Sequence, residues 1–310
     1  MPFLTVKDLC VRYHTSNGPV YAVENVDFDL EPGESIGIAG ESACGKSSLG
    51  LSIIRMLMGG TTSGDIVFDE KSLLDLPETE FDNEIRWKKI SMIFQGAMNS
   101  LDPVFTIKDQ FLEILQTHGF EGNHKQIISD TLHSVSLDDS ILNKYPHELS
   151  GGMKQRVVIA MALLLKPKFV IADEPTTALD VLIQAQIVNL LKKLKKTGMS
   201  IMLITHDLAV LSEIAEKICI MYSGQIVEFG NSYEVYKNPK HPYTQGLLNS
   251  IPRLRGDPPT YIKGVPPSLL QPLTECRFID RCPLAMEKCK KIPPKIKTET
   301  GYVQCWLYDE

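Results

Sequence analysis

The chain has 310 residues, of which 43% are hydrophobic and 23% charged, and its formal net charge is −6. This length suggests about two domains, and the composition is that of a folded globular protein. The negative charge argues against a partner made of nucleic acid. No apolar run approaches the ~20 residues that span a bilayer, and the first residues do not form a signal peptide. We therefore expect a protein of the cytosol or of the cytoplasmic face of a membrane.

The first part of the chain predicts an antiparallel layer of strands that leads into a phosphate-binding loop. Residues 3–36 alternate apolar and polar positions and contain two turn signals. A buried-type strand at 35–39 is followed at 40–47 by G-E-S-A-C-G-K-S, which fits the P-loop pattern G-x-x-x-x-G-K-[ST]. Backbone N–H groups and the following helix start hold an anion in such a loop. Lys46 then reaches the β- and γ-phosphates of a nucleotide, and Ser47 ligates Mg²⁺.

The middle of the chain predicts a helical insert between buried strands. A strand at 89–94 ends at Gln95, and helical periodicity appears at 107–118, 124–135 and 153–165. The last of these helices is opened by L-S-G-G-M, in which Ser150 is a predicted N-cap. Its start is a second candidate anion site.

Polar side chains follow the remaining buried strands. The strand at 169–173 ends at the adjacent carboxylates of Asp173 and Glu174, and the strand at 200–205 ends before His206. Asp173 suits the Mg²⁺ shell, and Glu174 suits the polarisation of an attacking water. Because ligands bind beyond the carboxyl ends of strands in open α/β sheets, these residues indicate a nucleotide site.

Together these segments resemble the nucleotide-binding subunit of ABC transporters over residues 3 to about 235. The resemblance implies the α/β fold of a P-loop NTPase, the ABC ATPase, with an antiparallel β-layer and a helical subdomain at about 97–166. It implies catalysis by Glu174, His206 and Gln95, and Mg²⁺ binding by Ser47 and Gln95. It identifies residues 178–180 as the D-loop. The residues that it implies for ATP binding are Tyr13 (adenine stacking), Gly40, Glu41, Ser42, Ala43, Cys44, Gly45, Lys46, Ser47, Ser48, Gln95, Ser150, Gly151, Gly152 and Asp173.

The resemblance also implies partners. Family members form head-to-tail pairs, in which ATP lies between the P-loop of one subunit and the signature helix start, here Ser150 to Gly152, of the other. The expected partners are a second ATPase subunit, two membrane permeases and, through the complex, an extracytoplasmic solute-binding protein. With these partners, the chain is expected to be a peripheral subunit on the cytoplasmic face of the cell membrane.

Two alternative functions are a soluble ABC ATPase and a subunit whose ATP site is inactive. The single cassette argues against the first, and the intact motifs argue against the second.

The C-terminal segment 236–310 predicts an irregular, proline-rich extension that is too small for a large core of its own. The stretches H-P-Y-T-Q-G-L-L from residue 241 and C-R-F-I-D-R-C-P-L-A from residue 276 resemble the extension of dipeptide and oligopeptide importer ATPases. The resemblance implies import of peptides, although nickel and oligosaccharide systems share the pattern. Since every predicted part of the ATP site precedes residue 210, we expect that site to be independent of the extension.

Four cysteines in the extension form a further candidate site, with the spacing C-x5-C-x6-C-x15-C. They are Cys276, Cys282, Cys289 and Cys305. In a reducing compartment such a cluster indicates a metal site before a disulfide framework. The spacing does not decide between a [4Fe–4S] cluster, zinc and metal-free or disulfide-paired thiols. The resemblance includes members whose cysteines here bind a [4Fe–4S] cluster, so we expect that cluster in a structural role.

Overall fold

A computed structural model describes residues 2–96, 99–177, 179–251 and 258–309. Contacts between residues divide the chain into two compact units, one formed by Met1–Leu74 with Ile204–Glu310 and the other by Asp75–Leu203. The first unit therefore joins the N-terminal part of the chain to the C-terminal extension. The domain boundary near residue 235 stays a prediction, because this division follows contacts and not function.

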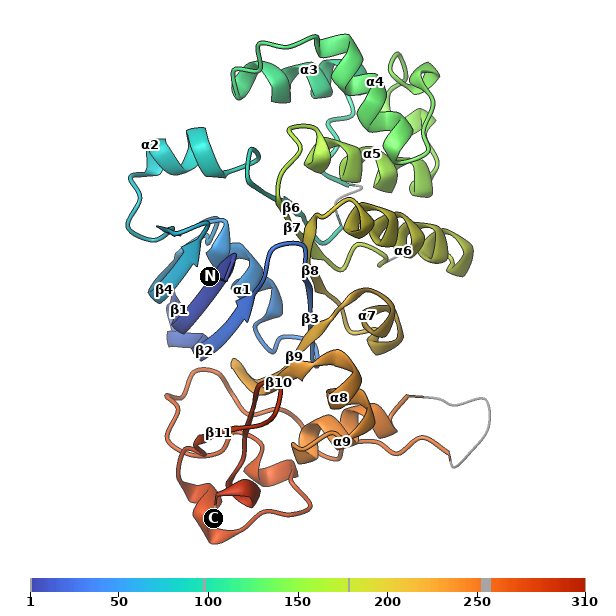
Figure 1. The fold of residues 1–310 in the computed structure, drawn as a ribbon. Coiled ribbons are helices and arrows are strands. Elements are labelled where there is room, and N and C mark those ends of the chain that lie inside the picture. The colour runs from blue at the N-terminus through green and yellow to red at the C-terminus, as the bar shows by residue number, and fades with distance from the viewer. Residues whose placement is uncertain (1, 97–98, 178, 252–257, 310) are drawn as a thin grey trace. The chain divides into compact units, whose positions relative to one another are not determined.

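The first unit contains the predicted antiparallel layer as a four-stranded sheet in the order β2-β1-β4-β5 (Figure 1). Its strands are β1 (Leu4–Thr15), β2 (Gly18–Leu30), β4 (Gly60–Phe68) and β5 (Lys71–Ser72). β1 pairs with β2 from Leu4 opposite Leu30 to Thr15 opposite Gly18. The hairpin turn therefore lies within the first of the two turn signals, S-N-G-P at 16–19, and the predicted layer is confirmed.

A second group of strands in the first unit follows the order β11-β12-β10-β9-β3. These strands are β3 (Ser35–Ala39), β9 (Lys217–Tyr222), β10 (Gln225–Asn231), β11 (Lys295–Lys297) and β12 (Tyr302–Gln304). β3 is buried along its whole length, as its apolar run predicts, and it pairs with β9 in parallel. β12 pairs antiparallel with β10. The extension therefore contributes a hairpin to this group, whereas the sequence predicted only irregular structure for it.

Helices and short turns complete the first unit. The helices are α1 (Lys46–Ile53), α7 (Leu208–Ile214), α8 (Ser232–Lys237) and α9 (Pro242–Asn249), and the extension adds 3₁₀ turns at Ile279–Arg281, Glu287–Lys290 and Trp306–Tyr308. The buried ring of Phe278 lies 5.2 Å from that of Tyr222 and 5.4 Å from that of Tyr243, measured between centroids. Through this aromatic cluster, two parts of the extension, Phe278 and the start of α9, pack together on the end of β9.

The second unit contains the predicted helical insert and three buried strands. Its elements are α2 (Glu78–Glu80), a π-helical turn (Phe81–Ile85), β6 (Ile90–Ile93), α3 (Ile107–Thr117), α4 (His124–Ser134), 3₁₀ turns (Asp139–Ile141 and Pro146–Glu148), α5 (Gly151–Leu163), β7 (Phe169–Asp173), α6 (Val181–Lys196) and β8 (Ser200–Ile204). Side chains of Thr106, Asn123 and Ser150 cap α3, α4 and α5. The three predicted helices are therefore confirmed. Within the described ranges, no helix combines the length and the apolar character needed to cross a membrane.

The stability of the first unit should depend on pH through His241. This side chain is 2% exposed where α9 begins, and its Nδ1 accepts a hydrogen bond from the Tyr243 N–H at 3.0 Å. Burial lowers the pKa of His241 from 6.5 to about 3. Unfolding in this range therefore takes up a proton, and stability falls as the pH drops from 6.5 towards 3 by at most about 1.4 kcal/mol per pH unit.

The measurement is urea unfolding of the wild type and His241→Asn at several pH values from 7 to 4. Asparagine keeps an acceptor at the helix N-cap but does not titrate. We expect a shallower loss of unfolding free energy in acid for the variant. Identical slopes for the two proteins would show that His241 does not carry this pH dependence.

Candidate functional site

The P-loop connects the end of β3 to the start of α1, and two of its glycines are required by both conformation and space. Gly40 and Gly45 have φ of +156° and +102°. A Cβ atom would lie 2.0 Å from the Met221 carbonyl oxygen at Gly40 and 2.2 Å from the Ala22 carbonyl oxygen at Gly45. The loop is therefore seated against β9 and β2, and it opens α1 as the motif predicts.

Lys46 places a buried positive charge inside this loop. Its side chain is 8% exposed, and its ammonium group donates hydrogen bonds to the carbonyl oxygens of Gly40 at 2.8 Å and Glu41 at 2.9 Å. Carbonyl dipoles satisfy the donors but do not neutralise the charge. A phosphate group is the kind of anion that completes such a site.

Cys44 lies beside this ammonium group and is a neutral thiol. Burial raises the pKa of Cys44, against the opposing effect of Lys46. The Lys46 ammonium lies 3.7 Å from its sulfur. The buried Cys44 side chain therefore fills space within the loop and adds no negative charge beside Lys46.

Tyr13 connects β1 to the first turn of α1. Its hydroxyl donates a hydrogen bond to Ser48 Oγ at 3.1 Å, and its ring is half-buried. Ser47, the predicted Mg²⁺ ligand, is also half-buried in this turn. The exposed Ser42 and Ala43 form the outer part of the loop, where Ala43 has a φ of +61°. Adenine stacking by Tyr13 stays a prediction.

His206 belongs to the same unit as the P-loop and follows β8 at an exposed position. The N–H of the preceding Thr205 donates to the Ile38 carbonyl oxygen in β3 at 3.2 Å. The following Asp207 caps α7, accepting a hydrogen bond from the Ala209 N–H at 2.9 Å. The backbone on both sides of His206 is therefore held, while the residue itself is exposed.

In the second unit, Asp173 and Glu174 stand at the end of β7. Asp173 is 3% exposed and is the last residue of the strand. Glu174 adopts the left-handed conformation, with a φ of +49°, and its Oε2 accepts a hydrogen bond from the Thr177 hydroxyl at 3.0 Å. A left-handed non-glycine residue costs of order 1–3 kcal/mol and is often found where function fixes the backbone. This conformation turns the chain sharply at the predicted catalytic carboxylate.

The signature stretch opens α5 in the same unit. Ser150 caps the helix, accepting from the Met153 N–H at 3.3 Å, and Gly151 is exposed beside it. Gly152 is buried, and a Cβ atom there would lie 3.0 Å from the side chain of Ile183 in α6. One turn further along α5, the Gln155 amide donates to the Pro175 carbonyl oxygen at 2.8 Å. That bond ties the signature helix to the loop that carries Glu174.

The remaining predicted residues of the second unit lie in connecting segments. Gln95 follows β6 at an exposed position. In the predicted D-loop, Asp180 caps α6 by accepting from the Ile183 N–H at 3.0 Å, and residue 178 lies outside the described residues. The predicted site residues are thus divided: the first unit holds the P-loop, Tyr13 and His206, and the second holds Gln95, the signature and the two carboxylates.

The four extension cysteines are free thiols that lie near one another. Cys276 and Cys282 are half-buried, and Cys289 and Cys305 are buried. The Cys276 N–H donates to the Cys289 carbonyl oxygen at 2.9 Å. Burial raises the pKa of Cys276 to about 12, and it also raises the pKa values of Cys282 and Cys305, with smaller contributions from neighbouring cysteines.

The metal expected at these cysteines receives no support. No group of three or more His, Cys, Asp or Glu side chains in the described ranges is placed to hold a metal ion. This finding counts against the zinc interpretation, in which four ligands surround a single ion. It also leaves the [4Fe–4S] cluster unsupported, so the spacing and the residue types did not establish a metal site.

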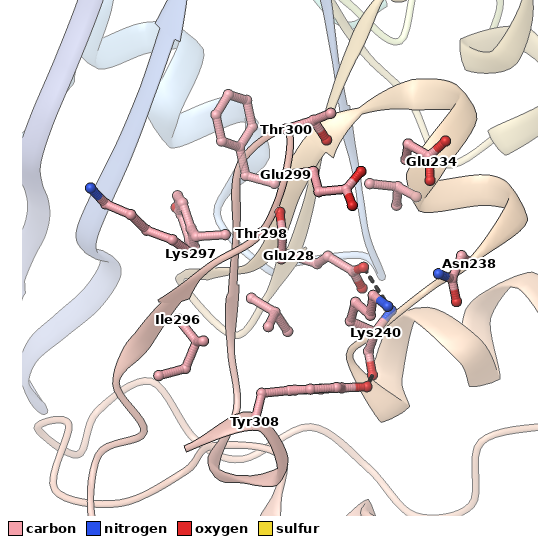
Figure 2. A pocket seen from close by; sticks show the side chains of 14 residues that line it. Glu228, Glu234, Asn238, Lys240, Ile296, Lys297, Thr298, Glu299, Thr300 and Tyr308 are labelled. Carbon is pink, nitrogen blue, oxygen red and sulfur yellow. Dashed lines mark hydrogen bonds between the residues drawn. The ribbon is translucent and has the colours of Figure 1, made fainter. Parts of the chain in front are cut away.

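A cavity of about 470 Å³ in the first unit contains none of the predicted site residues (Figure 2). It lies among β10, α8 and the β11–β12 hairpin, and the Glu228 carboxylate stands in it. Glu228 is 3% exposed and accepts hydrogen bonds from the N–H groups of Lys240 at 2.7 Å and His241 at 2.9 Å. The Tyr308 hydroxyl donates to the Lys240 carbonyl oxygen at 2.8 Å. These contacts, which the sequence did not predict, fix the chain where α9 begins.

Comparison with known proteins adds to this geometry. Residues 23–177, half of the chain, match the family model described as ABC transporter. The chain belongs to the ABC transporter family. Residues 227–289 of this ABC protein match a second model, described as oligopeptide/dipeptide transporter, C-terminal region. The resemblance inferred from the motifs is therefore confirmed for both parts of the chain.

Relatives of this ABC protein extend over nearly its whole length. The dipeptide transport ATP-binding protein DppD of Bacillus subtilis is 44% identical over 99% of this chain and 95% of its own length. The oligopeptide transport ATP-binding protein OppD of Haemophilus influenzae is 44% identical over 100% of this chain and 98% of its own. A dimeric ATP-binding cassette, solved in a post-hydrolysis state with ADP and Pi, is 30% identical with a TM-score of 0.65, covering 74% of this chain and 98% of that one. The predicted ABC ATPase fold is thereby confirmed.

The packing of the P-loop predicts unequal effects for two alanine substitutions. Gly45 and Gly18 have similar φ values of +102° and +111°, but only at Gly45 would a Cβ atom meet another atom within 4 Å. We expect Gly18→Ala to cost about 1–3 kcal/mol of backbone strain. Gly45→Ala should cost more and should also abolish ATP binding, because the loop must leave its seat on Ala22. Urea unfolding and calorimetric ATP titration measure the two effects. Equal losses of stability in both variants would contradict this account of the loop.

Proposed function

We propose that this chain is the ATP-hydrolysing subunit of an ABC importer for dipeptides and oligopeptides. The observation that carries the proposal is the full-length similarity to dipeptide and oligopeptide transport ATP-binding proteins, together with the matching C-terminal region. In this proposal residues 1–235 form the nucleotide-binding domain, and residues 236–310 form the extension characteristic of the peptide systems. The peptide itself is handled by other subunits.

In the proposed reaction each side chain has a limited task. Lys46 binds the β- and γ-phosphates, and its buried ammonium group supports this role. Ser47 and Gln95 would bind Mg²⁺, with Asp173 as a further residue of the site, and the bound ion would neutralise phosphate charge.

Hydrolysis needs a polarised water molecule. Glu174 accepts a proton from the attacking water as a general base, and its strained backbone after β7 supports a fixed position for the carboxylate. His206 contacts the γ-phosphate, and Tyr13 stacks on the adenine ring. A carboxylate is required at residue 174 because an amide cannot take up the proton.

The proposed assembly contains two ATPase subunits in head-to-tail orientation. The signature helix start at Ser150 serves the nucleotide bound to the partner, and the dimeric state of a similar cassette supports this arrangement. Two permease subunits and an extracytoplasmic solute-binding protein complete the transporter. The chain then acts on the cytoplasmic face of the membrane without crossing it.

The proposal is tested by ATP hydrolysis in the complex reconstituted with its permeases and solute-binding protein. Dipeptides or oligopeptides should stimulate hydrolysis several-fold, whereas nickel and oligosaccharides should not. If only nickel or an oligosaccharide stimulates hydrolysis, that solute and not a peptide is the cargo.

Glu174→Gln should retain ATP binding and lose at least about a hundredfold in the rate of hydrolysis, the usual contribution of a general base. Wild-type hydrolysis by Glu174→Gln would remove the assigned catalytic role.

We further propose that the four extension cysteines hold a [4Fe–4S] cluster with a structural role. Four free thiols gathered within one short segment support the proposal, because such clusters are bound by four thiolates. A cluster is larger than an ion, so its ligands stand farther apart than those of zinc. Burial raises the pKa values of Cys276, Cys282 and Cys305 and so disfavours their thiolate forms, and a bound metal centre is what would keep these three residues deprotonated.

This second proposal predicts a brown protein with about four irons per chain after purification without oxygen. Cys289→Ser should bleach the colour and make residues 270–310 more sensitive to limited proteolysis, because the metal is coupled to folding of the segment. Cys219→Ser, which changes a buried cysteine far along the chain from the four, is the control and should keep the colour. One zinc per chain, or no metal at all, would overturn the cluster.

A further inference from the structure

The extension contacts the P-loop directly, through the first residue after Gly40. The Arg281 guanidinium forms a two-pronged ion pair with the Glu41 carboxylate, with N–O distances of 2.8 and 2.9 Å. The Glu41 N–H donates a hydrogen bond to the Tyr243 hydroxyl at 3.0 Å. The Glu41 carbonyl oxygen accepts from the Lys46 ammonium group at 2.9 Å. Three parts of one residue thus join the extension to the phosphate-binding lysine.

Arg281 is firmly placed for this contact. It lies in the 3₁₀ turn before Cys282, and its side chain is 5% exposed. Its Nε donates to the Lys263 carbonyl oxygen at 3.0 Å, and its Nη1 also donates to the Tyr222 hydroxyl at 3.2 Å. The guanidinium of an arginine stays protonated in proteins, so the charge of Arg281 is permanent.

Tyr243 is equally well supported. Its ring is fully buried, with its centroid 4.6 Å from that of Tyr222. Tyr243 belongs to α9, whose start is held by the Glu228 carboxylate, which accepts from the Lys240 N–H (Figure 2). The same carboxylate accepts from the His241 N–H. Buried groups therefore hold both contacts on Glu41 in place.

A second observation places the extension beside the outer face of the loop. A cavity of about 380 Å³ is lined by residues 41–44 of the loop together with Pro266, Pro267 and Leu269 of the extension. Tyr222 and Ser223 complete the lining. The extension therefore borders the P-loop over several residues and not at Glu41 alone.

A carboxylate at this point presents an electrostatic problem for a nucleotide site. Glu41 is adjacent to Gly40, and its side chain is 27% exposed. Unpaired, it would repel the phosphates of ATP, because like charges several ångströms apart near a protein surface interact unfavourably. The Arg281 charge neutralises it, and the two-pronged geometry fixes its orientation.

We propose that Arg281 is a positioning residue for ATP binding, which neutralises and orients Glu41 so that the P-loop accepts the phosphates of the nucleotide. This inference rests on the proposed ATP site. It makes the extension part of the nucleotide-binding machinery, and it replaces the expectation that the site is independent of residues after 210. Arg281 acts through Glu41 and does not touch the nucleotide in this proposal.

The test is calorimetric titration of ATP into the full-length chain and its variants. Arg281→Gln leaves the Glu41 carboxylate unpaired, so we expect affinity to fall about tenfold. Adding Glu41→Gln to that variant removes the repelling charge and should restore most of the affinity. Raising the ionic strength should shrink the defect of Arg281→Gln, because salt screens the repulsion.

Two controls separate this effect from a loss of folding or of the ATP site. Lys295→Gln removes another ion pair of the extension, to Asp27 in β2, and should leave ATP affinity unchanged. Urea unfolding of each variant reports its stability. Lys46→Ala should lose binding, and wild-type affinity in that variant would mean that the proposed ATP site is wrong.

Two results would contradict the role proposed for Arg281. It is overturned if Lys46→Ala loses binding while Arg281→Gln binds ATP like the wild type. It is also overturned if the double variant remains as weak as Arg281→Gln at every salt concentration, because the defect then has a structural and not an electrostatic origin.

Discussion

The close seating of the P-loop on two strands is the constraint on which the rest of the first unit depends. Carbonyl oxygens of Met221 in β9 and Ala22 in β2 leave no space for a side chain at Gly40 or Gly45. The loop consequently has one path, and the carbonyl groups along it hold the buried Lys46 ammonium. A small displacement of the loop would break those bonds while Lys46 remained buried, which is costly for an ammonium group.

Much of the fold follows from local signals, which explains why it was predictable. The helices α3 and α4 have apolar residues at helical spacing, and α5 is a long apolar run; each of the three begins after a capping side chain. The buried strands β3, β7 and β8 are short apolar runs bounded by polar residues or turns. Each of these signals lies within a few neighbouring residues of the sequence. The motifs could be found for the same reason, because their residues are close together in the sequence.

Contacts between distant residues were not predictable in this way. Arg281 and Glu41 are separated by 240 positions, and Lys295 and Asp27 by 268. A single sequence contains many charged residues and no sign of which two will pair. The same holds for β12, whose three residues carry no strand signal strong enough to indicate pairing with β10. The left-handed conformation of Glu174 is likewise imposed by its surroundings, since glutamate does not favour it.

The extension has too few apolar residues to fold around itself, and its stability must come from the part of the chain that precedes it. Phe278 packs on Tyr222, and the β11–β12 hairpin continues from β10. Arg281 is the clearest case, because an almost fully buried guanidinium needs a carboxylate, and the one it has belongs to the P-loop. Glu41 in turn needs a cation before the loop can accept a phosphate. Each side supplies the charge that the other lacks, so the pair couples folding of the extension to the electrostatics of the nucleotide site.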